Sequence, residues 1–288
     1  MRRIAFEVSA GTLYARVAGP DDGPAVILLH GFPDFSYGWR KQIPALAAAG
    51  WLVVALDQRG YNESAKPKNV RDYAVSELTA DVIAVADALG RERVALVGHD
   101  WGGIVAWAVG MQHPHRVHRM VILNAPHPAV ARRFLMTSPR QMLRSWYMLF
   151  FQLPKVPEKL FSAAGFEAGV RSLTATSAPG TFSAEELDTY RAAWSQPGAL
   201  TAMINWYRAL ARHARRSEVE PIEVQAPTRI VWGAQDQFLL RELATASARY
   251  CRSGDLVELE NATHWLHLEQ PERVNATVLD WLDRSGNS

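Results

Sequence analysis

The chain has 288 residues, of which 48% are hydrophobic and 21% are charged, as is typical of soluble globular domains. Its net charge of +2 is too small to indicate a nucleic-acid partner, and its single cysteine, Cys251, excludes an intrachain disulfide and suits a reducing compartment. There is no apolar run long enough to cross a bilayer and no signal-peptide core, so we expect a cytoplasmic protein without a membrane partner.

The first half of the chain alternates short β-rich runs with helical patterns. A hairpin is expected first, over residues 4–9 and 13–18. Nearly continuous apolar runs, typical of parallel strands covered on both faces, follow at residues 25–30, 51–57, 94–99 and 120–125. Helical patterns separate them near residues 36–49, 75–89 and 101–112. This alternation predicts βαβ units and a mostly parallel, doubly wound α/β sheet.

The pattern changes at Pro128, and no strand-like run appears before about Val219. This stretch is helical in propensity and rich in aromatic residues, and we interpret its basic run at residues 208–216 as one solvated helix face. The alternation then resumes, with strands at 228–233 and 255–260, a helix near 239–250 and a last helix from Pro271. Two strands alone cannot bury a core, so we predict one α/β core (1–127 and 220–288) interrupted by a helical insert (128–219).

The most informative segment is the turn between the strand at 94–99 and the helix that follows it. The strand ends in Gly98-His99-Asp100-Trp101-Gly102, the strand–turn–helix context of a nucleophile elbow. The residue at the centre of such a turn is usually serine, and here it is Asp100. An alternative interpretation is that this aspartate only caps an ordinary helix.

An aspartate at this position changes the chemistry. A carboxylate has a reference pKa of about 3.9, so it is ionised near neutral pH without a base, and we expect the adjoining helix N-terminus to favour the charge further. Attack on a carboxylic ester would give a reactive anhydride, whereas attack on a saturated carbon with a leaving group gives an ester that water can hydrolyse. Asp100 therefore indicates substrates such as epoxides or alkyl halides.

Elbow hydrolases carry the nucleophile, an acid and a histidine in that order along the chain. Asp236 follows the predicted strand at 228–233 and His264 follows the next one, so both lie where α/β sheets place their ligands. His264 would deprotonate the water that attacks the ester, and Asp236 would orient its ring. Asp57 also ends a strand, but it precedes the nucleophile. We expect no cofactor or metal, because His113, His115 and His118 lack zinc-type spacing.

Two backbone N–H groups are expected to form an oxyanion hole. One belongs to Trp101, directly after the nucleophile, and the other to Phe32 in the loop after the predicted strand at 25–30. Pro33 follows in the sequence HGFP and is a candidate for a cis peptide bond.

Six short motifs together resemble the soluble epoxide hydrolases of the α/β-hydrolase fold. They occur in order between residues 25 and 280: HGFP (30–33), DQRGY (57–61), GHDWGG (98–103), NAPHP (124–128), WGAQD (232–236) and THW (263–265). The resemblance implies a mostly parallel twisted sheet flanked by helices, with a helical lid inserted after the sixth strand. One departure is Asn62, where the family usually has glycine.

The resemblance also implies an activity. Such an enzyme converts an epoxide to a vicinal diol through an alkyl ester on Asp100, and two lid tyrosines bind the epoxide oxygen and donate a proton. Tyr147 and Tyr207 fall in segments similar to those that carry these tyrosines, although aromatic residues in a helical lid also pack as its core. The expected partners are a small apolar epoxide and water, and the chain would be a monomer or a homodimer.

Two other functions stay open at this point. Haloalkane dehalogenases share the aspartate and a tryptophan after it, but they usually have a side-chain donor where this chain has Phe32. Fluoroacetate dehalogenases usually have arginine in place of Trp101. A non-catalytic binding protein on the same scaffold is the third possibility, although Asp100, Asp236 and His264 are all present. Measuring whether turnover yields a diol or a free halide separates an epoxide hydrolase from a dehalogenase.

Overall fold

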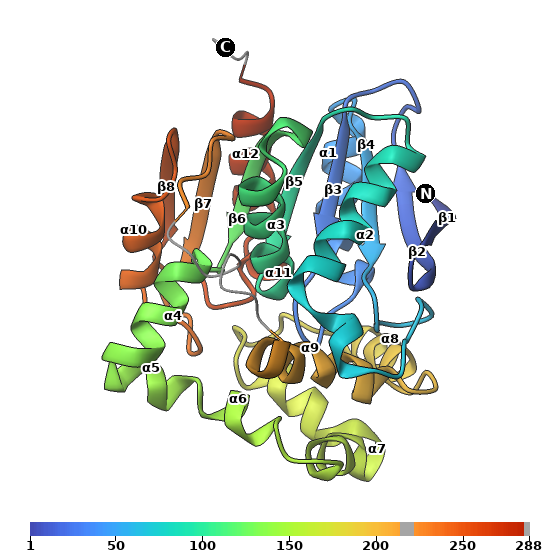
Figure 1. Cartoon of the computed structure of the whole chain (residues 1–288), viewed down its shortest axis with the longest axis vertical. Helices are drawn as coiled ribbons and strands as arrows, with labels where there is room; N and C mark the ends of the chain where they lie inside the picture. Colours follow the sequence, from blue (N-terminus) through green and yellow to red (C-terminus); the bar gives the residue numbers. More distant parts are fainter. Residues whose placement is uncertain (214–221, 285–288) are drawn as a thin grey trace.

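A mostly parallel sheet of eight strands forms the centre of the molecule in the computed structural model, which describes residues 1–213 and 222–284 (Figure 1). The strand order is β1-β2-β4-β3-β5-β6-β7-β8, and only the pairs β1–β2 and β2–β4 are antiparallel. The strands are β1 (Arg2–Val8), β2 (Gly11–Ala18), β3 (Ala25–Leu29), β4 (Leu52–Asp57), β5 (Val94–His99), β6 (Val117–Leu123), β7 (Thr228–Gly233) and β8 (Gly254–Leu259). The predicted α/β fold is confirmed.

Helices cover both faces of this sheet. The helices of the first half and of the C-terminal part are η1 (Ser36–Lys41), α1 (Ile43–Ala48), η2 (Val70–Tyr73), α2 (Val75–Ala88), α3 (Trp101–Gln112), η3 (Pro114–Arg116), α10 (Glu242–Ala248), α11 (Leu266–Glu269) and α12 (Pro271–Leu282). The helical pattern expected at 36–49 is divided at Gln42 into η1 and α1, because Pro44 starts a new helix there. None of the helices in the described part of the chain has both the length and the apolar character needed to span a bilayer.

Successive residues of the central strands point into two separate cores. Ile27, Leu96 and Ile122 face α2 and α3, whereas Val26 and Val97 face the opposite layer with α1 and α12. Both faces are buried, which explains why these strands read as nearly continuous apolar runs.

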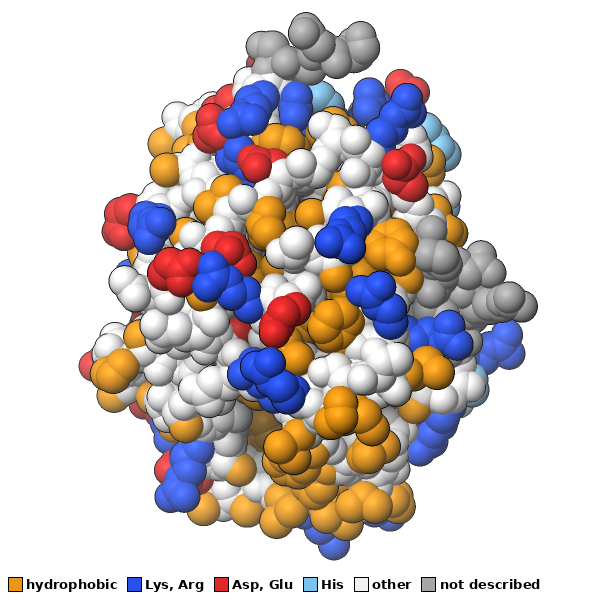
Figure 2. All heavy atoms as spheres, turned by 90° about the vertical axis from the view of Figure 1, so that its left-hand side faces the viewer, with side chains coloured by type: hydrophobic (Ala, Val, Ile, Leu, Met, Phe, Trp, Pro, Cys, Tyr) orange, Lys and Arg blue, Asp and Glu red, His pale blue; other side chains and the backbone are white. Residues whose placement is uncertain are grey.

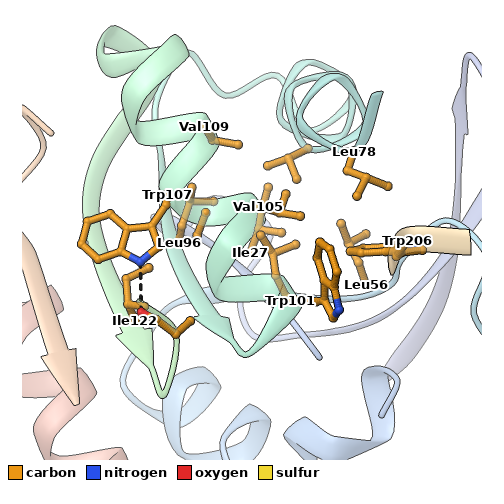
Figure 3. Close-up of a cluster of buried hydrophobic side chains, with 14 of the residues drawn as sticks. Ile27, Leu56, Leu78, Leu96, Trp101, Val105, Trp107, Val109, Ile122 and Trp206 are labelled. Atoms are coloured by element: carbon orange, nitrogen blue, oxygen red, sulfur yellow. Dashed lines mark hydrogen bonds between the residues drawn. The ribbon is translucent and has the colours of Figure 1, made fainter. Parts of the chain in front are cut away.

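The core around α3 connects the sheet to the insert. Figure 3 shows Val105 of α3 beside Leu78 of α2, and Trp107 donating a hydrogen bond of 3.1 Å to the carbonyl oxygen of Ala125. Trp206 enters this core from the insert, and its indole N–H donates to the carbonyl oxygen of Arg59 at 2.9 Å. The insert is therefore anchored in the same core as the sheet.

The chain between β6 and β7 forms six helices and no strand within residues 128–213. They are α4 (Pro128–Thr137), α5 (Pro139–Arg144), α6 (Trp146–Phe150), α7 (Val156–Thr174), α8 (Ala184–Trp194) and α9 (Ala199–His213). Figure 1 shows α5 to α9 gathered below one end of the sheet. That end carries Asp100 after β5, and Asp236 and His264 after β7 and β8.

The basic run at residues 208–216 is not one solvated face. Arg208 is buried and donates to the carbonyl oxygens of Phe151 and Leu153 at 3.0 and 2.8 Å, and to Glu158 at 2.7 Å. The prediction was wrong there because an arginine with several fixed acceptors can be buried. Residues 214–216 of this run lie outside the described residues.

Candidate active site

Asp100 occupies a strained turn between β5 and α3. Its φ is 51° and its ψ is −121°, a conformation that non-glycine residues rarely adopt. The neighbouring backbone leaves no room for larger residues: a Cβ atom on Gly102 would lie 2.0 Å from the carbonyl oxygen of Leu29. Close packing of α3 on the sheet thus holds Asp100 at the end of β5 in this conformation.

The carboxylate of Asp100 faces two backbone donors. The N–H of Phe32 donates to its Oδ1 at 2.9 Å, and the N–H of Trp101 also bonds it. Phe32 is joined to Pro33 by a cis peptide bond. Burial raises the pKa of Asp100 and outweighs the opposing effect of His264 and the two N–H groups. We had expected the helix N-terminus to favour the charge, but burial has the larger effect.

His264 lies between the carboxylates of Asp100 and Asp236. Its Nδ1 is 2.7 Å from Oδ2 of Asp236, and its Nε2 is 3.6 Å from Oδ2 of Asp100. Burial by itself would lower the pKa of His264, but the charges of Asp236 and Asp100 together raise it. The structure therefore brings these three predicted residues together in the order Asp236, His264, Asp100.

Three further donors hold the carboxylate of Asp236. The N–H groups of Phe238 and Leu239 donate to its Oδ1 at 2.7 and 2.9 Å, and the amide of Asn124 donates to Oδ2. The Oδ1 of Asn124 accepts from the N–H of Gly233 at 2.7 Å. Asn124 was not among the predicted site residues, although its place directly after β6, beside β5 and β7, could have indicated it.

Tyr147 and Tyr207 lie opposite Asp100, on α6 and α9. Their ring centroids are 5.9 Å apart, and the ring of Tyr207 stands 5.0 Å from that of Trp101. Burial and the nearby charge of Asp100 raise the pKa of Tyr147, and burial, Tyr147 and Asp100 raise that of Tyr207. Both phenols are thus protonated at neutral pH and face a carboxylate.

Asp100, Trp101, Tyr147 and Tyr207 line one cavity of about 890 Å³. Most of the remaining wall is apolar: Ile104, Ala125, Pro126, Pro128, Ala131, Leu135, Met136, Met148, Leu210, Leu239 and Leu243. Such a wall favours an apolar ligand, with a few polar groups that fix its orientation.

Two other residues at strand ends, Asp57 and His99, have structural partners. Asp57 accepts from the N–H of Ser36 at 2.9 Å and from the amide of Asn62, which has the positive φ of 47° that glycine would favour. His99 contacts the carbonyl oxygen of His264 at 2.9 Å. Within residues 1–213 and 222–284, no group of three or more His, Cys, Asp or Glu side chains could hold a metal ion.

Comparison with known proteins assigns the family. The sequence profile of the alpha/beta hydrolase fold matches residues 24–271. The chain belongs to the alpha/beta hydrolase fold family. Within this family it is 40% identical to the AB hydrolase superfamily protein YfhM of Bacillus subtilis (strain 168), over 94% of both chains.

Several α/β-hydrolase relatives are named as epoxide hydrolases. Epoxide hydrolase A of Mycobacterium tuberculosis is 33% identical over 92% of both chains. The crystal structure of Bacillus megaterium epoxide hydrolase in complex with an inhibitor superposes with a TM-score of 0.87 at 29% identity, covering 98% of this chain and 100% of that one. The resemblance seen in the motifs thus extends over nearly the whole chain.

Proposed function

We propose that this protein is an epoxide hydrolase that forms a vicinal diol through a covalent ester on Asp100. The observation that carries the proposal is the cavity itself, in which an elbow carboxylate faces the phenols of Tyr147 and Tyr207. A carboxylate supplies a nucleophile for a saturated carbon, and a phenol supplies an acid for an alkoxide leaving group. The names of the relatives support the same activity.

In the first step, Oδ2 of Asp100 attacks an epoxide carbon and the bond from that carbon to the epoxide oxygen breaks. The oxygen takes a proton from Tyr147 or Tyr207, which leaves an alkyl ester and a tyrosinate. Oδ1 becomes the carbonyl oxygen of the ester and keeps its hydrogen bond to the N–H group of Phe32, while the N–H group of Trp101 also bonds this carboxyl group.

In the second step, Nε2 of His264 takes a proton from water, and the hydroxide attacks the ester carbonyl carbon. Negative charge then develops on Oδ1, where the two N–H groups stabilise it. The ester bond breaks, and the leaving alkoxide takes the proton of the added hydroxyl group, which gives the diol and restores the carboxylate of Asp100. The proton on His264 is returned through solvent to the tyrosinate. Asp236 orients the ring and stabilises its charged form.

The helices α4 to α9 would act as the lid of this site, because they supply both phenols and most of the apolar wall. We propose that the lid begins at residue 128, where β6 has ended. Its other boundary, with the lid ending at 219 and the core resuming at 220, lies outside the described residues. The cytoplasmic location and the choice between monomer and homodimer stay predictions.

The decisive experiment is a single turnover with excess enzyme in heavy-oxygen water. The proposal expects the heavy oxygen in the carboxylate of Asp100, found by peptide mass spectrometry, and not in the diol. Heavy oxygen in the diol would mean that water attacks the epoxide directly, and would refute the ester on Asp100. The substrates should include styrene oxide, aliphatic epoxides, chloroalkanes and fluoroacetate.

The same panel tests the two other functions. Phe32 offers no side-chain donor to a halide, and the indole of Trp101 already shares a hydrogen bond with Tyr207. We therefore expect diol formation to exceed halide release. Halide release without diol would assign a dehalogenase, and no turnover of any compound would favour a binding protein.

A further inference from the structure

The lid has a second apolar face, which points away from the cavity. Leu149 is 77% exposed, Leu143 is 76% exposed and Trp146 is 61% exposed, whereas most large hydrophobic side chains of the described chain are buried. The remaining exposed members of this face, which we call the outer lid face, are Met142, Leu153, Val156 and Leu160. Its members recur every three or four residues along α5, α6 and the start of α7.

The same helices also have a conventional inner face. Tyr147, Phe151 and Phe161 pack toward the cavity and the core, so inward packing does not require the outer residues to be apolar. Figure 2 shows hydrophobic side chains gathered along the lower edge of the molecule, where Figure 1 places these helices. A contiguous exposed patch of this kind is typical of a binding surface.

The segment around this face carries an excess of positive charge. Residues 128–163 contain six Lys or Arg residues but one acidic residue, Glu158. Glu158 is paired with the buried Arg208 and does not neutralise the surface. Lys155 and Lys159 lie beside the apolar residues of α7 and are exposed. In Figure 2, Lys and Arg side chains lie near the apolar edge.

An apolar face surrounded by positive charge favours some binding partners over others. In a symmetric dimer through this face, the positive charges of both copies would meet. An anionic lipid surface instead offers an apolar interior for the Leu and Trp side chains and negative headgroups for Lys155 and Lys159. The exposed residues Arg132 and Met136 also line the cavity, so its mouth opens beside this face.

We propose that the outer lid face docks the protein peripherally on an anionic membrane surface. This contact needs no spanning helix, and it differs from our expectation that the protein has no membrane partner. The inference does not depend on the proposed function, because it rests on the outer side of the lid. Docking would place the mouth of the cavity next to the lipid bilayer, in which apolar molecules accumulate.

Co-sedimentation of the full chain with vesicles tests this inference. We expect binding to phosphatidylcholine vesicles with 30% phosphatidylglycerol, about 1 in 3 headgroups being anionic, and weaker binding to pure phosphatidylcholine. The double variant L143S/L149S should lower the partition coefficient at least ~10-fold, because it removes two inserting side chains. K155Q/K159Q should lower it about 20-fold at low ionic strength and much less at high salt.

A matched variant, R93Q/R284Q, removes two exposed positive charges from the end of the molecule opposite the lid and should bind as the wild type does. Turnover of a water-soluble epoxide and the melting temperature should be unchanged in L143S/L149S, which separates loss of docking from loss of folding or catalysis. No sedimentation of the wild type with anionic vesicles, or equal binding by L143S/L149S, would overturn the proposal. The proposal would also be overturned if the wild type dimerised in a concentration-dependent way without binding vesicles, and if L143S/L149S abolished that dimerisation.

Discussion

The Nε2 atom of His264 lies 3.6 Å from Oδ2 of Asp100, which is beyond the usual length of a hydrogen bond. In a site with a serine nucleophile, the histidine must bond the nucleophile to remove its proton. In the proposed mechanism, Asp100 attacks as a carboxylate and needs no such contact. His264 would then be free to act on water in the second step alone.

Replacing His264 by Gln should separate the two steps. The ester on Asp100 should still form, and it should persist because no base activates the water. General-base contributions of about 10²–10⁴-fold set the expected slowing. Intact-protein mass spectrometry after addition of styrene oxide should show one adduct, and exposed His118 replaced by Gln is the matched control. Absence of the adduct in H264Q, together with turnover in the wild type, contradicts the scheme.

The pH dependence of ester hydrolysis should follow His264. Its folded pKa is raised, and only the neutral ring accepts a proton, so the rate should fall as the pH drops through that raised pKa. Asp236→Asn removes one of the charges that raise the pKa. The midpoint of the acid limb should therefore move to lower pH, while the plateau rate falls. Rapid-quench measurement of ester decay checks this, and an unmoved midpoint argues that Asp236 supports only the fold.

Tyr147→Phe and Tyr207→Phe should each slow ester formation on epoxides, and the double variant should nearly abolish it. An alkoxide is a poor leaving group without a proton donor, and the expected loss is about 10²–10⁴-fold. Stopped-flow measurement of the first step is the readout. Tyr190→Phe is the control, because Tyr190 is a buried insert tyrosine that donates to Asp34 at 2.9 Å and does not line the cavity. Undiminished epoxide opening in the double variant refutes the role of the phenols.

Arg208→Met should destabilise the protein by about 3 kcal/mol, because it leaves Glu158 unpaired and two carbonyl oxygens without their donor. Urea unfolding followed by circular dichroism measures the loss. Arg171→Met removes an exposed i,i+4 pair with Glu167 and should cost less than about 0.5 kcal/mol. Equal effects of both variants would mean that the contacts of Arg208 do not hold α9 against the segment from Phe151 to Glu158.

Local patterns were sufficient to predict the sheet and the three residues that meet at its edge. Apolar strands buried on both faces read as continuous runs, and the ends of neighbouring parallel strands meet at one edge, which brings Asp100, Asp236 and His264 together. Glycines around Asp100 also identified the turn, since close helix packing excludes larger residues there.

Other features depend on contacts between distant segments and could not be read from local patterns. Arg208 looked solvated beside other basic residues, but acceptors near residues 151–158 bury it. The amide of Asn124 is neither a nucleophile nor a titratable group, so its hydrogen bond to Asp236 becomes evident only in the folded structure. The periodicity of the sequence did not distinguish the outer lid face from the inner face, because these helices carry apolar residues on both sides.

The position of the insert also sets the order in which the sheet closes during synthesis. Strands β6 and β7 are hydrogen-bonded neighbours, with Met120 opposite Thr228, yet about 100 residues separate them along the chain. Until the ribosome has released β7, the edge of β6 has no partner strand, and open edges promote aggregation. This edge of the nascent chain therefore stays open well after Asp100 has been made and before His264 exists.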